Sequence, residues 1–124
     1  MRVFVTKPFA RFADRESIGD EDLWEAVARA ENRLIDADLG GGAIKQRIAR
    51  REQGRSGGYR AVVLFRKSSR AFFVYGFAKK DQGNISAKEL RAFRILADAM
   101  LNMDEAALSA AKRNQTLMEI ERDG

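Results

Sequence analysis

The chain has 124 residues, of which 45% are hydrophobic and 33% are charged, a composition that fits one globular domain and argues against intrinsic disorder. It contains no cysteine and no histidine, which excludes disulfides and thiolate chemistry and argues against a zinc site. Any general acid or base must therefore be Asp, Glu, Lys, Arg or Tyr. No apolar run has the length of a signal peptide or a membrane span, so we expect a single domain over residues 1–124, located in the cytoplasm and without membrane association.

The first part of the chain predicts one strand and two helices. Residues 2–6, RVFVT, alternate in the manner of a strand, and Pro8 can occupy the first turn of a following helix capped by Thr6 or Lys7. A longer helix is predicted from Asp20 through the stretch DEDLWEAVARAENRLIDA, and the three glycines at 40–42 end it. Its apolar stripe follows helical spacing, with Leu23, Val27, Ala30 and Leu34 as members.

The middle of the chain predicts three strands joined by short loops. In the first, residues 43–50, two sets of side chains alternate between the faces: Ile44, Gln46 and Ile48 on one, and Lys45, Arg47 and Ala49 on the other. The next two, YRAVVLF at 59–65 and AFFVYGFAK at 71–79, are almost continuously apolar, which is typical of central strands covered on both faces.

The last part predicts helices. Ser86 and Glu89 form a capping box, and a helix follows whose apolar stripe contains Leu90, Phe93, Ala97 and Met100. Asp104 caps a final segment, residues 105–124, that we expect to be helical. This order of elements predicts an α+β fold: a small, mostly antiparallel sheet made of the N-terminal strand and a three-stranded meander, with helices packed on one face.

Positive charge is concentrated in the middle of the chain. Between residues 41 and 80 there are eleven Lys or Arg and one acidic residue, Glu52, so this segment carries +10 while the rest of the chain carries −5. Such a region attracts polyanions in a salt-sensitive way. The alternative is that these cations only protect exposed strand edges from pairing with other chains.

The predicted meander brings cations and aromatic rings to one sheet: Lys45, Arg47, Arg60 and Lys79 beside Tyr59, Tyr75 and Phe77. Cations position phosphates, and aromatic faces stack unpaired bases. A cation cluster can also stabilise the charge that develops when a ribose 2′-OH attacks its own 3′-phosphate. RNA cleavage without histidine or metal is thus chemically feasible, although binding without cleavage fits the same pattern.

The glycine-rich loop GRSGGYR, residues 54–60, does not fit the pattern of a nucleotide-binding loop. The phosphate-binding motif requires Gly-Lys-Ser/Thr at the start of a helix, whereas a strand follows here. The glycines suit a hairpin connection, and no cofactor is expected.

Several motifs in fixed order resemble the RelE/ParE toxin superfamily, in particular its HigB-like RelE branch. They are Lys45-x-Arg47, then Ser56-Gly57-Gly58-Tyr59-Arg60, then Tyr75-Gly76-Phe77-Ala78-Lys79 with Asn84-Ile85. The resemblance implies the toxin of a type II toxin–antitoxin system, a ribosome-dependent mRNA endoribonuclease that is neutralised by a cognate antitoxin. Its partners would be that antitoxin, the ribosome and mRNA.

The resemblance also implies roles for particular residues. Lys45, Arg47, Arg60 and Lys79 match the family's catalytic cations. We expect a second group to bind RNA without chemistry: Arg50, Arg51, Arg55, Tyr59 and Tyr75. The general base stays open, as do two rival functions, a ParE-like toxin that inhibits gyrase and a nucleic-acid-binding module without activity.

Overall fold

The computed structural model describes residues 1–49, 58–78 and 85–122. Its helices are α1 (Lys7–Arg15), α2 (Asp20–Glu31), α3 (Ala87–Leu101) and α4 (Glu105–Arg113). Its strands are β1 (Arg2–Thr6), β2 (Ala37–Gly40), β3 (Ala43–Ile48), β4 (Tyr59–Arg66), β5 (Arg70–Ala78) and β6 (Leu117–Ile120). None of the helices in these ranges is both long and apolar enough to cross a membrane.

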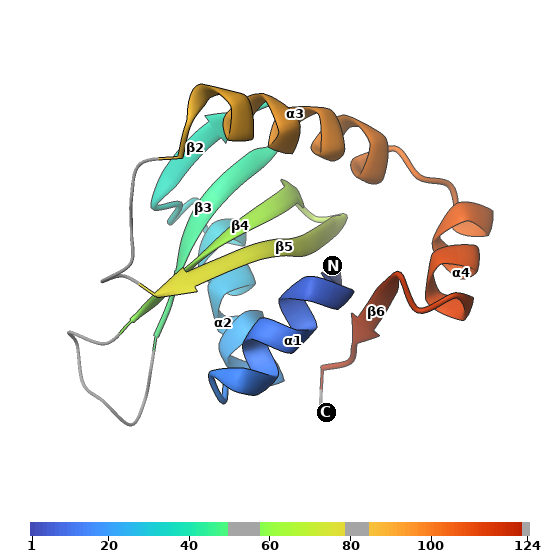
Figure 1. The fold of residues 1–124 in the computed structure, drawn as a ribbon, viewed down its shortest axis with the longest axis horizontal. Helices are drawn as coiled ribbons and strands as arrows, with labels where there is room; N and C mark the ends of the chain where they lie inside the picture. The colour runs from blue at the N-terminus through green and yellow to red at the C-terminus, as the bar shows by residue number, and fades with distance from the viewer. Residues whose placement is uncertain (50–57, 79–84, 123–124) are drawn as a thin grey trace.

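The strands form one sheet in the order β2-β3-β4-β5-β1-β6 (Figure 1). β1 lies parallel to β5, and every other neighbouring pair is antiparallel. The predicted α+β class and the mostly antiparallel sheet are therefore confirmed.

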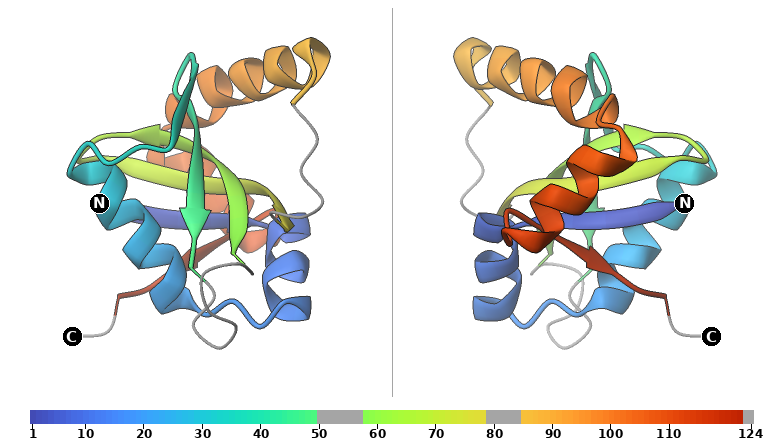
Figure 2. Two further views of the ribbon diagram at one scale, coloured as in Figure 1. Left: turned by 90° about the vertical axis from the view of Figure 1, so that its left-hand side faces the viewer. Right: turned by 90° about the vertical axis from the view of Figure 1, so that its right-hand side faces the viewer.

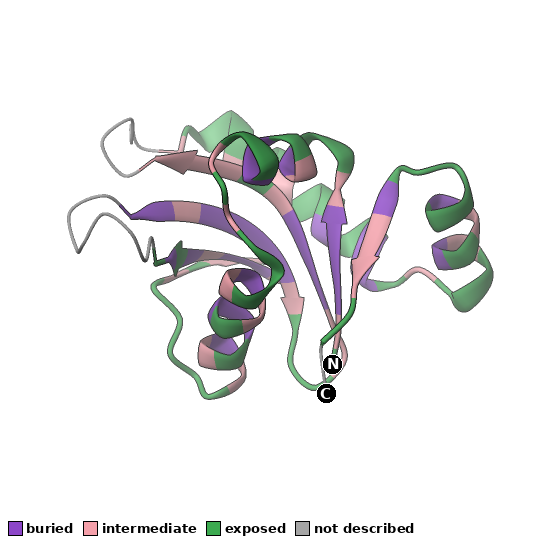
Figure 3. Cartoon of the chain, turned by 90° about the horizontal axis from the view of Figure 1, so that it is seen from below, coloured by how far each residue is buried: buried purple, intermediate pink, exposed green. Residues whose placement is uncertain are grey.

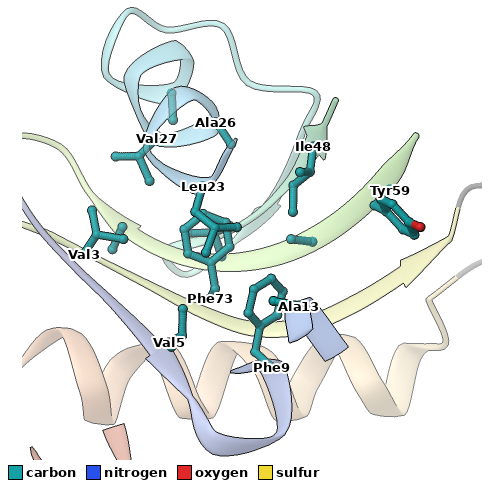
Figure 4. Close-up of a cluster of buried hydrophobic side chains, with 14 of the residues drawn as sticks. Val3, Val5, Phe9, Ala13, Leu23, Ala26, Val27, Ile48, Tyr59 and Phe73 are labelled. Carbon is teal, nitrogen blue, oxygen red and sulfur yellow. The ribbon is translucent and has the colours of Figure 1, made fainter. Parts of the chain in front are cut away.

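Helices cover both faces of this sheet, not one as expected (Figures 1 and 2). On one face, α1 and α2 pack onto a core that includes Phe9, Leu23 and Phe73 (Figure 4). On the other, α3 and α4 pack onto a second core, with Leu64 and Phe72 from the sheet. For this reason β4 and β5 contain runs of consecutive buried residues (Figure 3), and consecutive residues of a strand point to opposite faces.

The expected helix starts are confirmed. The Thr6 hydroxyl accepts from the Phe9 N–H at the start of α1, where Pro8 occupies the first turn. Ser86 and Glu89 form the capping box of α3, and Asp104 caps α4. Each cap satisfies N–H groups that have no partner within the helix.

Two element predictions are wrong. The helix from Asp20 ends at Glu31, because Arg33 adopts a left-handed conformation with φ of 65°, and the chain then forms β2. Leu34, assigned to the apolar stripe, is 61% exposed. The segment after α4 forms β6 and pairs with β1 instead of continuing as a helix, and Leu117 at its start is buried.

Candidate functional site

Two rows of cross-strand neighbours bring the predicted site residues together on β3, β4 and β5. Arg47 lies opposite Arg60, and Arg60 lies opposite Phe77 on β5. Two residues along, Lys45 lies opposite Val62, and Val62 lies opposite Tyr75. Successive rows on one face of a sheet are about 6.7 Å apart, so the side chains of both rows meet in one small area.

These rows lie on the sheet face that α3 covers further along. Along β3, Ile44 and Ile48 belong to the core under α1 and α2, so the intervening Lys45 and Arg47 point to the opposite face. Lys45 is half-buried and Arg47 is exposed. The alternation predicted for this strand is confirmed.

A bulge in β5 places Tyr75 and Phe77 beside the cations. Val62 pairs with Tyr75 while Val63 pairs with Phe73, so Val74 is an extra residue on β5. The bulge reverses the alternation and turns Gly76 toward α1. A side chain is excluded at Gly76 because a Cβ there would lie 2.4 Å from Cε2 of Phe12.

The two arginines oppose each other without a neutralising carboxylate among the described residues. Arg47 donates its N–H to Oδ2 of Asp36 and accepts at its C=O from Nη2 of Arg29, both outside β4. Arg47 and Arg60 are thus a non-hydrogen-bonded pair, the type in which side chains approach more closely. Across residues 1–49, 58–78 and 85–122, no ion pair involves Lys45, Arg47 or Arg60. Directly opposed like charges destabilise a sheet, and an anion placed between them relieves the repulsion.

Aromatic rings border the cations. The Tyr75 side chain is 44% exposed, and its ring centroid is 5.7 Å from that of Phe77 and 6.0 Å from that of Phe93 on α3. Phe93 therefore holds the inner side of the Tyr75 ring while part of that ring is open to solvent. This geometry suits the stacking of an unpaired base next to its phosphate.

Tyr59 does not share this face, contrary to expectation. Only 1% of it is exposed, and it belongs to the core under α1 and α2. Its hydroxyl donates to Oε1 of Glu16 at 2.7 Å, and its ring meets Phe12 edge-on at 5.6 Å. Adjacent residues of a strand point to opposite faces, so Tyr59 and Arg60 cannot both face the cations.

Four of the predicted site residues lie outside the described residues: Arg50, Arg51, Arg55 and Lys79. Their expected roles stay predictions.

Sequence reasoning missed the residues that hold the Arg47 backbone. Arg29 comes from α2, and Asp36 immediately precedes β2. Next to them, Gln46 is 1% exposed and accepts the Asp36 N–H at Oε1 over 2.9 Å. Neither charge belongs to a local motif. The only signal in the sequence is that the polar Gln46 shares its face of the strand with the apolar Ile44 and Ile48.

Residues 1–120 match the family model described as the RelE toxin of the RelE/RelB toxin–antitoxin system. No curated protein matches the chain.

Proposed function

Because the chain belongs to the RelE toxin family, we propose that it is a ribosome-dependent endoribonuclease that cuts mRNA and thereby stops translation. The observation that carries this proposal is the opposed Arg47–Arg60 pair beside an exposed Tyr75. A fold under no functional constraint has no reason to keep two such cations face to face, since the repulsion works against stability.

The proposed reaction needs no metal ion. The ribose 2′-oxygen attacks the adjacent phosphorus, a bond forms between them, and the bond from phosphorus to the 5′-oxygen of the next nucleotide breaks. The 2′-OH proton passes to a base, and the leaving 5′-oxygen takes up a proton. The products are a 2′,3′-cyclic phosphate and a 5′-OH end.

Each site cation has a proposed role in that reaction. Arg47 and Arg60 hold the non-bridging phosphoryl oxygens and stabilise the charge that grows on them in the transition state. Lys45, one row away, neutralises the same phosphate or the leaving oxygen. Tyr75 stacks on a base and so aligns the ribose with the phosphate.

The partners we propose are a cognate antitoxin, the ribosome and mRNA. RelE toxins are half of a toxin–antitoxin pair, so we expect a cognate antitoxin whose acidic segment covers the cations. The substrate complex would be mRNA on the ribosome, which places the protein in the cytoplasm.

Induced expression tests the site. Cells that express the wild-type chain should stop growing and show mRNA cut at defined positions, as mapped by primer extension. The double variant Lys45→Ala/Arg47→Ala and the single variant Arg60→Ala should permit growth. Lys67→Ala is the matched control, because it removes one exposed cation just beyond the far end of β4 and should stay toxic.

Other outcomes would identify the rival functions. DNA breaks with intact mRNA would indicate a gyrase inhibitor, and unchanged mRNA and DNA would indicate a binding module. If cleavage survived in both site variants, the site would be wrongly assigned.

A further inference from the structure

The Arg47 backbone is held from outside the sheet, and we infer that Asp36 and Arg29 are positioning residues for the Arg47 guanidinium. This inference rests on the proposed cleavage function. The Arg47 N–H donates to Oδ2 of Asp36, and Nη2 of Arg29 donates to the Arg47 C=O. Both backbone polar groups of Arg47 are therefore fixed by charged side chains.

These two side chains replace a strand that ends too early. β2 pairs with β3 from Gly40 opposite Ala43 to Ala37 opposite Lys45. Arg47 lies two residues further along β3, where β4 is its only neighbouring strand among the described residues. An edge peptide exposes its N–H and C=O to water. Asp36 and Arg29 instead offer an acceptor and a donor where the next strand would have run.

The pair is itself anchored to α2. Nε of Arg29 donates to Oε1 of Glu25 at 2.8 Å, one helical turn away. Nη1 of Arg29 lies 3.8 Å from Oδ2 of Asp36, so the two positioning residues also form an ion pair. Their side chains are 25% and 29% exposed. The charges are thus partly shielded from water, which strengthens their interaction relative to an exposed pair.

Gln46 holds the backbone of Asp36 in place. Its buried amide donates from Nε2 to two carbonyl oxygens and accepts the Asp36 N–H at Oε1. The carbonyls belong to α2 and to the segment after it, at Ala26 and Leu34, at 2.9 and 3.2 Å. The backbone of Asp36 is held by β3 through Gln46, while its carboxylate holds β3 through Arg47.

The hydrogen bonds from Asp36 and Arg29 to the Arg47 backbone, together called the clamp, matter because Arg47 lies opposite Arg60. Two guanidinium groups on opposed residues repel each other, and a free edge peptide at Arg47 would yield to that repulsion. Displacement of a catalytic group by about 1 Å is enough to slow a reaction by on the order of 100-fold. Because the clamp contacts only the Arg47 backbone, it keeps the Arg47 side chain pointing at the phosphate and leaves the guanidinium available to bind that phosphate.

Single-turnover cleavage of a short mRNA on purified ribosomes tests the inference. Asp36→Ala should slow cleavage by about tenfold or more, with the ribosome concentration for half-maximal rate changed less than about threefold. Asp36→Asn should recover part of the rate, because its amide oxygen still accepts the Arg47 N–H. Asp38→Ala is the matched control: Asp38 is two residues away, and its carboxylate accepts from Gly40 and not from β3. The control should match wild type.

A double-variant cycle separates positioning from general stabilisation. In the Arg47→Ala background, Asp36→Ala should cause little further loss, since the side chain to be positioned is gone. Equal losses in both backgrounds would overturn the inference, as would an Asp36→Ala rate equal to wild type. If Arg47→Ala itself cleaves normally, the proposed site fails instead, so the two failures are distinguishable. Arg29→Ala and Arg29→Lys should repeat the pattern, with lysine partly restoring the rate.

Discussion

Replacing Arg47 by glutamine should make the fold more stable while it slows cleavage by on the order of 100-fold. Glutamine keeps most of the aliphatic stem and leaves the clamped backbone unchanged, so the main loss is one positive charge opposite Arg60. Favourable cross-strand pairs contribute about 0.2–1 kcal/mol each, and directly opposed like charges destabilise a sheet. Coulomb's law gives the same order, roughly 0.7 kcal/mol for unit charges about 6 Å apart in water. We therefore expect the free energy of unfolding to rise by about 0.5 kcal/mol.

Thermal and urea unfolding at low and high salt measure this effect. At low ionic strength, the midpoint for Arg47→Gln should exceed that of wild type by about 2–3 °C for a domain of this size. In about 1 M salt the difference should disappear, because exposed charges are then screened within about 3 Å. The Arg47→Gln substitution should also lower the cleavage rate by on the order of 100-fold, as expected for the loss of one preorganised hydrogen-bond donor. Lys67→Gln should alter neither quantity.

Two results would refute a repulsion between Arg47 and Arg60: Arg47→Gln destabilises the fold by about 1 kcal/mol or more, or its effect on stability does not depend on salt. Either result would mean that Arg47 stabilises the sheet as an ordinary surface residue. Retention of full cleavage activity would remove Arg47 from the site.

Three further predictions concern an ion pair at the β6 edge of the sheet, the Tyr75 ring in the site and the buried Tyr59. The Glu119 carboxylate accepts two hydrogen bonds from Arg2, at 2.9 and 3.0 Å, and these lower the pKa of Glu119 from 4.5 to about 2. The lowered pKa stabilises the fold fully above pH 4.5, and this stabilisation is lost as the pH falls toward 2. Thermal unfolding of Glu119→Gln should accordingly depend less on pH between 5 and 2.5 than that of wild type, and identical pH profiles would refute the linkage. Tyr75→Ala should weaken RNA binding by about 1–3 kcal/mol in a fluorescence titration while Tyr75→Phe binds normally; equal losses would exclude stacking. Tyr59→Phe should lower the stability by about 1 kcal/mol, because the hydrogen bond to Glu16 is lost, with a normal cleavage rate; a catalytic defect at unchanged stability would contradict its structural role.

Local sequence signals were sufficient for the parts of the fold that depend on local physics. The alternation in β3 and the caps at Thr6, Ser86 and Asp104 appear in the structure as predicted. Each of these features depends on residues that lie within four or five positions of one another in the sequence. The α+β class follows from the order of such elements.

The missed elements depend on distant partners. β2 and β6 are four residues long and gain their hydrogen bonds from β3 and β1, so neither has a strong pattern of its own. The bulge at Val74 lies in an apolar run in which every residue suits either face, so its alternation is hidden. These features follow from packing, which single-sequence patterns do not register.

The candidate site was predictable in part. Lys45, Arg47 and Arg60 share a face as the alternation and the meander require. Tyr59 was placed on the wrong face, although its position next to Arg60 already excluded a shared face. The clamp from Arg29 and Asp36 was beyond prediction, because it joins a helix and a loop to the backbone of a strand.

The most direct test of the central claim is the chemistry of the RNA ends. Ribosomes programmed with a short mRNA are incubated with the wild-type chain, and the 5′ and 3′ ends of the products are identified. The account predicts a 5′-OH and a 2′,3′-cyclic phosphate, no cleavage when the nucleotide before the cut is 2′-deoxy, and a rate about 100-fold lower for Arg60→Ala. Cleavage of the 2′-deoxy message, or an undiminished rate for Arg60→Ala, would contradict it.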